Sequence, residues 1–325
     1  MVGKMHFVRQ WHVPGEGRYN VGHSAALPPP VALYEEVRSI KPYIKLMRVH
    51  HYIKNFLVFA ALICNGQLFC FDKLSAELAG FVAFCMVSSV VYIINDVRDA
   101  EKDRQHPTKR MRPIAAGMVS VKSAWMLAAV LLLIAVICNC LVFHVTATIL
   151  LALYLLLNVA YSFGLKNIPI VDITILVAGF LIRILYGAII TEITISNWLY
   201  LTVIAMAFYF ALGKRRNELK RTGSGDTRQV LKSYPISFLD KYMNICLTLA
   251  NVFYALWSMD EKTMSFYRSR YLVVTVPVVL IITMKYGLDI ERDSDGDPVE
   301  VLLHDKVLLG LCILYLSVMF LILYF

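Results

Sequence analysis

Residues 95–117 read NDVRDAEKDRQHPTKRMRPIAAG and follow directly on the uncharged stretch LAGFVAFCMVSSVVYII at residues 78–94. The first stretch is dense in Asp, Lys and Arg. The second, as a helix, is about 25 Å long and crosses most of the hydrocarbon core of a bilayer. If that helix continues past Ile94, a cluster of opposite charges stands at the mouth of a membrane span. This junction predicts both the fold class and the place of the functional site.

The rest of the 325-residue chain is equally apolar, with 58% hydrophobic residues and a mean hydropathy of +0.63. A span needs about 20 mainly apolar residues. Candidates lie at residues 53–71, 78–95, 123–143, 145–165, 168–190, 198–213, 242–259, 271–284 and 307–325. We therefore predict an all-α integral membrane protein with about nine transmembrane helices.

Residues 1–47 differ from the rest as a more polar N-terminal segment, ahead of a transmembrane domain at residues 48–325. No sustained apolar stretch after a basic start indicates a cleavable signal peptide. Between residues 33 and 47 apolar positions recur at helical spacing, which predicts an interfacial helix bent at Pro42.

Lys and Arg gather in alternate loops between the predicted spans, and this asymmetry accounts for much of the net charge of +9. Loops rich in Lys and Arg stay on the cytoplasmic side. We therefore expect the N-terminus and the charged mouth of the second span to be cytoplasmic and the C-terminus to be outside. No nucleic-acid partner is needed to explain the basic balance, and no nucleic-acid-binding pattern is evident.

The acidic residues of the opening stretch have helical spacing. Asp96, Asp99 and Asp103 stand at i, i+3 and i+7, and Asn95 pairs with Asp99 at i+4, so all of them share one helix face. Carboxylates stacked in this way repel one another unless a cation lies between them. Mg²⁺ is the favoured candidate because it takes one or two carboxylates plus substrate phosphates. The helix is expected to end just before Pro107.

Lys109, Arg110 and Arg112 follow that helix end and would turn back toward whatever the metal holds. Carboxylates for a metal and cations for phosphate oxygens together fit a metal-bound diphosphate. The alternative for the basic residues is a solvated cytoplasmic loop. A bias toward positive loops does not explain an acidic triplet at helical spacing.

The pattern Asn95-Asp96-x-x-Asp99-x-x-x-Asp103 resembles the first aspartate-rich motif of the intramembrane prenyltransferase (UbiA) superfamily. The continuation HPTKRMRPIAAG is similar to the branch comprising decaprenyl-phosphate phosphoribosyltransferase. Further similarities are YIKN at residues 52–55, YSFGLK at 161–166 and GKRRNEL at 213–219. Where the branch shows Arg-Pro and then Trp, this chain has Arg48-Val49 and Tyr52. The resemblance runs from about Arg48 to the C-terminus.

This resemblance implies a bundle of nine spans whose central cavity opens to the cytoplasm and the lipid. It also implies a Mg²⁺-dependent transfer of 5-phosphoribose from phosphoribosyl diphosphate (PRPP) to a polyprenyl (decaprenyl) phosphate. Pyrophosphate would leave, and the product would serve cell-envelope polysaccharide synthesis at a bacterial inner (plasma) membrane. Asp96, Asp99 and Asp103 would hold the metal, with Asn95 beside them.

Residues 214–218 read KRRNE where ordinary members of the superfamily carry a second aspartate-rich motif. A site that gives up carboxylates and adds cations serves more phosphate and fewer metals. This favours phosphoribosyl transfer over aromatic prenylation. The 5-phosphate and the acceptor phosphate would share one pool of cations, which sequence does not divide: Lys54, Lys166, Arg183, Lys214 and Arg215.

Two ionisable residues lie within the fifth span. Asp172 and Arg183 are about 16 Å apart along a helix yet within roughly 20° of the same face. Charges inside a span usually face a polar cavity, which places Arg183 on a substrate phosphate and Asp172 near the ribose hydroxyls or a second metal. The alternative for this pair is structural pairing with another helix. For Lys54 the alternative is snorkelling toward water.

Two rival functions remain. One is an aromatic prenyltransferase that uses an isoprenyl diphosphate, and the other is a transporter or flippase of a phosphorylated lipid. Acidic residues at 289–300 resemble a calcium loop, but position twelve is Leu302 instead of Glu, so the EF-hand pattern fails. A solvated acidic loop is the favoured interpretation there, and metal binding is the alternative.

Overall fold

The computed structural model describes residues 40–222, 229–267, 269–291 and 298–324. The regular elements of these ranges are all helices. In chain order they are α2 (Lys41–Met47), η1 (Val49–Phe59), α3 (Ala60–Cys64), α4 (Phe71–Gln105), η2 (Lys109–Met111), α5 (Val121–Cys140), α6 (Val145–Phe163), η3 (Leu165–Asn167), α7 (Val171–Ile190), α8 (Asn197–Thr222), η4 (Gln229–Ser233), α9 (Ile236–Met259), α10 (Glu261–Tyr267), η5 (Tyr271–Val274), α11 (Thr275–Glu291), α12 (Pro298–His304) and α13 (Lys306–Tyr324). The predicted all-α class is confirmed.

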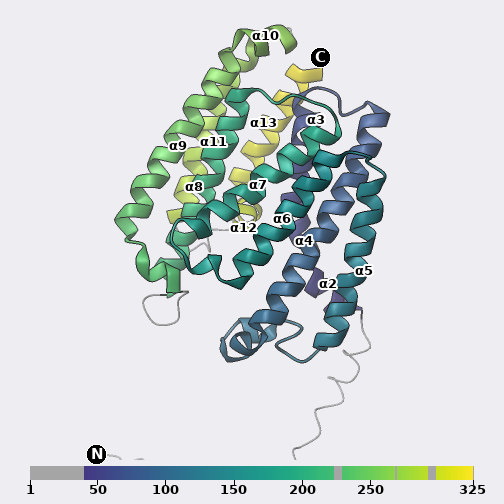
Figure 1. The fold of residues 1–325 in the computed structure, drawn as a ribbon. Coiled ribbons are helices and arrows are strands. Elements are labelled where there is room, and N and C mark those ends of the chain that lie inside the picture. Colours follow the sequence, from purple (N-terminus) through teal and green to yellow (C-terminus); the bar gives the residue numbers. More distant parts are fainter. Residues whose placement is uncertain (1–39, 223–228, 268, 292–297, 325) are drawn as a thin grey trace, which may run out of the picture.

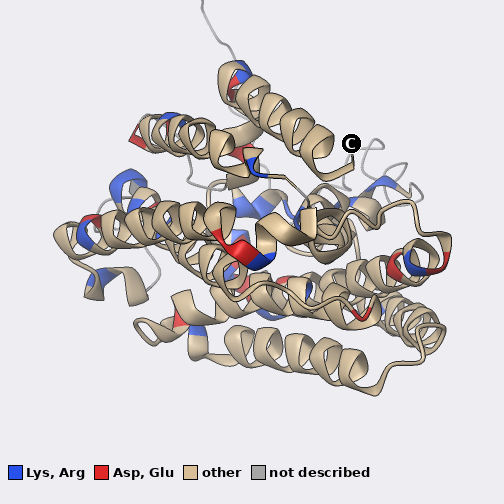
Figure 2. Ribbon diagram, turned by 90° about the horizontal axis from the view of Figure 1, so that it is seen from above, with Lys and Arg blue, Asp and Glu red and all other residues tan. Residues whose placement is uncertain are grey.

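The long helices form one bundle, with α2 at one end and α10 and the C-terminal end of the chain at the other (Figure 1). α4 packs most extensively against α5, and α8 against α9. α7 lies between these two pairs and contacts η1, α6 and α8. In Figure 2 long stretches of the ribbon are tan, with charged residues mainly near helix ends and in the middle of the bundle.

Six of the described helical segments are long and apolar enough to cross a membrane. They are Phe71–Gln105, Val121–Cys140, Val145–Phe163, Val171–Ile190, Tyr271–Glu291 and Lys306–Tyr324. A shorter apolar segment runs over Val49–Cys64, and α8 and α9 have 26 and 24 residues. The protein is therefore a multi-pass membrane protein, and the count of nine spans stays a prediction.

The first two predicted spans have different bounds in the structure. The apolar residues 68–71 extended the first predicted span to residue 71, but its helix ends at Cys64. Gly66 has a φ of +65°, a left-handed conformation that glycine adopts without strain, and the chain reverses there. α4 then begins at Phe71, seven residues before the predicted second span. Hydropathy does not show this break because apolar side chains continue across the turn.

α4 carries the aspartate-rich motif at the end of its membrane-crossing part. Its 35 residues give a length of about 52 Å, well beyond the roughly 30 Å of a hydrocarbon core. The helix is continuous through residues 95–103 and ends at Gln105, with His106 in an extended conformation before Pro107. The predicted continuation of the helix and its predicted end are both confirmed.

η1 is an unusual element because all eleven of its residues form a 3-10 helix. Runs of more than three or four residues are uncommon. With three residues per turn, every third side chain lies on the same face. One row faces α4, where the Tyr52 and Ser89 hydroxyls are hydrogen-bonded at 2.7 Å and the Asn55 amide donates to Ser88 at 3.3 Å. A second row, with His51 and Lys54, faces a cavity.

The predicted interfacial helix of residues 33–47 is described only from residue 40 onward. α2 begins at Lys41 and carries Pro42 in its first turn, where proline is tolerated because the first N–H groups have no helical partner. Half of the acidic stretch 289–300, at residues 292–297, lies outside the described residues.

Candidate active site

A cavity of about 520 Å³ opens among the ends of α4, α6, α7 and α8 and beside η1. The residues that line it are Arg48, His51, Lys54, Val91, Tyr92, Asn95, Asp99, Lys102, Asp103, Lys109, Arg112, Tyr154, Asn158, Tyr161, Ser162, Lys166, Asn167, Ile175, Leu176, Gly179, Phe180, Arg183, Phe210, Ala211, Lys214, Arg215 and Pro298. Nine of these described residues are Lys or Arg and two are carboxylates. The cavity is therefore strongly cationic.

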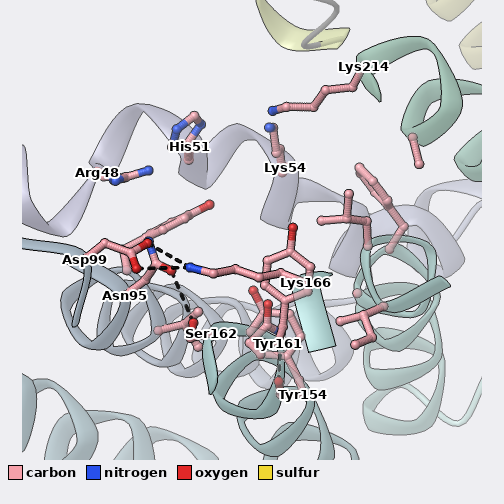
Figure 3. Close-up of a pocket in the computed structure, with 18 of the residues that line it drawn as sticks. Arg48, His51, Lys54, Asn95, Asp99, Tyr154, Tyr161, Ser162, Lys166 and Lys214 are labelled. Carbon is pink, nitrogen blue, oxygen red and sulfur yellow. Dashed lines mark hydrogen bonds and ion pairs between the residues drawn. The ribbon is translucent and has the colours of Figure 1, made fainter. Parts of the chain in front are cut away.

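Asp99 is the predicted metal ligand that the structure places most directly in the cavity. The Lys166 ammonium donates to both of its carboxylate oxygens, at 2.9 and 3.1 Å (Figure 3). Asn95 lies one turn earlier on α4 and accepts a hydrogen bond from the Ser162 hydroxyl at 3.3 Å. These contacts bring the motif of α4 against the end of α6 and η3.

Asp96 and Asp103 are joined by one arginine. Arg112 donates from Nη1 to Asp103 at 2.7 Å and to Asp96 at 3.2 Å, and Arg48 donates to Asp96 at 2.7 Å. Asp96 is only 2% exposed and does not line the cavity, whereas Asp103 does. Asp96 thus binds Arg48 and Arg112, and both arginines line the cavity.

The basic residues after α4 do not all reach the cavity. Lys109 and Arg112 line it, in agreement with the predicted turn back toward the motif. Arg110 is exposed and is not among the described lining residues. Arg110 is thus the one of the three that fits the alternative of a solvated loop.

The predicted phosphate ligands of the spans all reach the cavity. Lys54 and Lys214 point toward one another from η1 and α8 (Figure 3). Arg183 lines the deeper part of the cavity from the middle of α7 and is 7% exposed. Lys166 and Arg215 complete the predicted pool.

Asp172 has a different surrounding from the one predicted. It is fully buried, does not line the cavity, and accepts hydrogen bonds from Arg215 Nε at 2.7 Å and from the Tyr234 hydroxyl at 2.6 Å. Burial, together with the hydrogen bond to Asp172, raises the pKa of Tyr234 to about 12, so this hydroxyl stays protonated and donates. Arg215 also donates to Glu218 at 2.8 Å and to the Tyr161 hydroxyl at 2.9 Å.

These bonds account for all three guanidinium nitrogens of Arg215 and tie α6, α7 and α8 together. The structural pairing with another helix, which was the alternative interpretation for Asp172, is therefore present in the structure. Asp172 fixes a wall of the cavity instead of facing a ligand.

The residues of the cavity fit a magnesium ion that takes some of its ligands from the protein and the rest from substrate phosphates. Among the described residues no three His, Cys, Asp or Glu side chains gather closely enough to hold a metal by themselves. Asp99 and Asp103 nevertheless offer carboxylate oxygens at the cavity wall, and Asn95 adds an amide oxygen. Mg²⁺ is typically held by one or two carboxylates, with waters and substrate phosphates filling its other positions.

Several lining residues were missed from the sequence. Arg48 and His51 follow the three-residue period of η1, which an α-helical spacing does not show. Tyr154, Asn158 and Tyr161 line the cavity from α6 at i, i+4 and i+7. Polar side chains at helical spacing within a span were the available signal, because they mark a face turned away from lipid.

Comparison with known proteins gives the same fold and family. Residues 56–300 match the UbiA prenyltransferase family. The chain is 36% identical over 280 residues to decaprenyl-phosphate phosphoribosyltransferase of Mycolicibacterium smegmatis, covering 82% of this chain and 87% of that protein. It is 32% identical over 281 residues to the protein of the same name from Mycobacterium tuberculosis, covering 84% and 91%.

A solved structure of a UbiA homolog from Archaeoglobus fulgidus, bound to GPP and Mg²⁺, superimposes with a TM-score of 0.61 at 18% identity. The likeness covers 87% of this chain and all of that one. That likeness gives the same fold, and the family match over residues 56–300 together with the 36% identical relative shows that this chain belongs to the UbiA prenyltransferase family.

Proposed function

We propose that this protein transfers 5-phosphoribose from PRPP to a polyprenyl phosphate such as decaprenyl phosphate and releases pyrophosphate. The observation that carries the proposal is the charge of the cavity, with nine cations against two carboxylates among its described lining residues. PRPP brings three phosphate groups and the acceptor a fourth, so these substrates match a large surplus of positive charge. The names of the two mycobacterial relatives support the same transfer.

The donor diphosphate would lie at the α4 end of the cavity. Asp99 and Asp103, with Asn95, would hold Mg²⁺ there. The metal would neutralise charge on the departing pyrophosphate. Lys109 and Arg112 would contact its remaining oxygens, and Asp96 would keep Arg112 in place.

The other lining residues would position the acceptor phosphate next to the ribose of PRPP, although both substrates are anionic. As the bond to pyrophosphate breaks, ribose C1 develops the oxocarbenium character of glycosyl transfer. The acceptor phosphate is already anionic near neutral pH, so its oxygen attacks C1 without a general base. Catalysis then rests on positioning and electrostatic stabilisation by the cationic walls. Lys54, Lys166, Arg183 and Lys214 are the cations available for the acceptor phosphate and the 5-phosphate.

The test is direct transfer by the purified protein. We would incubate it with decaprenyl phosphate, PRPP labelled in the ribose and Mg²⁺, with an EDTA control. Label in the lipid phase together with free pyrophosphate, both abolished by EDTA, is the expected result. Prenylation of an aromatic acceptor with no effect of PRPP would instead show an aromatic prenyltransferase. Lipid-phosphate binding without pyrophosphate release would point to a transporter.

We also propose that the cavity faces the cytoplasm of a bacterial inner membrane, where PRPP is available. The cavity lies at the end of the bundle that carries the motif of α4 and the basic segments after it. Its location agrees with the placement of Lys- and Arg-rich loops on the cytoplasmic side.

A further inference from the structure

Arg183 is a buried cation in the middle of α7 with neutral partners. Its Nη1 donates to the Gly179 carbonyl at 2.6 Å, its Nη2 to the Tyr154 hydroxyl at 3.0 Å, and its Nε to the Asn55 side-chain oxygen at 2.8 Å. Its guanidinium carbon lies about 5 Å from the ring centres of Phe84 and Tyr154. No carboxylate of the described residues pairs with it. A guanidinium at this depth is costly unless an anion joins it.

The guanidinium is also able to receive an anion. It carries five N–H donors, and three of them serve the partners above, which leaves two for a ligand. Arg183 and Gly179 both line the cavity. A Cβ at Gly179 would lie 3.4 Å from Nη1, in van der Waals contact with it, so the glycine leaves Nη1 more open than another residue would.

Asn55 determines where this group points. Its side chain is 1% exposed, and its amide nitrogen donates to Ser88 and to the Cys85 sulfur on α4, at 3.3 Å each. Asn55 therefore fixes Arg183 of α7 against α4 through η1. Because an amide carries no charge, it orients the guanidinium without neutralising it. An aspartate in its place would hold the same Nε and cancel the charge.

We propose that Asn55 is a positioning residue that presents Arg183 to a phosphate monoester in the deep part of the cavity. This inference rests on the proposed function, in which two groups have that chemistry: the 5-phosphate of PRPP and the phosphate of the lipid. The diphosphate belongs to the other end, at Asp99. Arg183 is thus assigned to a phosphate monoester, which the sequence alone did not separate from the other phosphate-binding roles of the cations.

The experiment uses Asn55→Asp and a matched control, Asn139→Asp. Asn139 is also a buried asparagine, 6% exposed, and its side-chain oxygen accepts from Tyr186 of α7 at 2.8 Å. Its amide donates to Thr148 at 2.7 Å. It does not line the cavity, so it reports what the same substitution does to helix packing alone.

Binding is measured by calorimetry with ribose 5-phosphate and, separately, with farnesyl phosphate, both without metal or diphosphate. We expect Asn55→Asp to raise the Kd for one of the two at least tenfold without lowering Tm, and Asn139→Asp to bind both as the parent protein does. The probe that loses affinity identifies which substrate Arg183 receives. Arg183→Gln should weaken the same probe.

Equal affinity of the parent and Asn55→Asp for both probes would overturn the inference, as would binding of neither probe by the parent. Equal losses in Asn55→Asp and Asn139→Asp would show a packing effect instead. If Asn55→Asp lowers Tm, Arg183→Lys replaces it. That variant keeps the charge but loses the planar fork that Asn55 holds, and unchanged binding by it would also refute the proposal. A parent protein that binds a probe through Arg183 but transfers no label would refute the proposed function alone.

Discussion

At the scale of single residues, Lys166 belongs both to the proposed metal site, through Asp99, and to the cations proposed to bind phosphate. Its ammonium contacts both oxygens of Asp99. A metal ion bound at Asp99, as proposed above, would lie close to this ammonium and would be repelled by it. The ion pair would therefore lower metal affinity in the absence of substrate, and Lys166 would contact substrate phosphates once they bind.

Asp99→Asn tests the metal end of the cavity. We expect kcat/KM for transfer to fall roughly 100-fold, since a loss of about 3 kcal/mol of charge stabilisation has that effect on rate. Mg²⁺ titration of the initial rate is the measurement, and half-saturation should move to higher concentration. The control is Glu101→Gln, an exposed residue on the same helix that does not line the cavity. Parent-like rates and Mg²⁺ dependence in Asp99→Asn would remove Asp99 from the site.

At the scale of elements, α7 connects the two pairs of helices. Its N-terminal end is tied to α8 by Asp172 and Arg215, its middle carries Arg183, and its C-terminal half packs against η1 at Gly187. Small residues allow helices in membranes to approach closely. A Cβ at Gly187 would overlap the Val58 carbonyl oxygen, which belongs to the backbone and has little freedom to move away.

Gly187→Ala should therefore destabilise the fold, by about 1–3 kcal/mol if η1 shifts to make room. The thermal unfolding midpoint in detergent measures this. Gly310→Ala on α13 is the matched control because an added Cβ there meets nothing within 4 Å. Similar midpoints for the two variants would contradict the close approach of α7 and η1.

The ion pair between Asp172 of α7 and Arg215 of α8 predicts that substitutions of the two residues have non-additive effects on stability. Asp172→Asn takes the buried carboxylate from the Arg215 guanidinium and leaves it only the more exposed Glu218. The cost should be about 3 kcal/mol, at the low end for breaking a buried pair, because one carboxylate remains. The double variant with Arg215→Met removes both charges, so it should be more stable than the sum of the single losses predicts. Unfolding midpoints of the four proteins form the cycle. Strict additivity would show that the two side chains do not interact.

At the scale of the whole molecule, sequence predicted the parts that depend on local patterns. The helical spacing of Asp96, Asp99 and Asp103 and the proline that ends α4 are local, and both were confirmed. The partners of these carboxylates were not predictable, since Lys166 and Arg48 come from segments far along the chain. The role of Asp172 needed the fold as well, because only the folded structure shows that Arg215 and Tyr234 bond to its two oxygens. The 3-10 conformation of η1 left no signal in hydropathy.

Membrane orientation is the prediction that belongs to the molecule as a whole. The positive loops predict that the C-terminus lies outside. In the structure it lies at the end of the bundle opposite α2 (Figure 1). Alkaline phosphatase fused after Phe325 should therefore be active in a bacterial host, and the same enzyme fused after Thr222 inactive. The reverse pattern of activities would place the cavity on the outer side, away from cytoplasmic PRPP.

The three-residue period of η1 restricts how the length of this segment can change among related chains. One residue inserted between Tyr52 and Asn55 would rotate everything before it by about 120°. The row with His51 would then leave the cavity, and Tyr52 would lose its place against Ser89. An insertion or deletion of three residues would restore both rows with a shift along the axis of about 6 Å. Homologous chains that keep this helix should therefore differ in length here by multiples of three or not at all.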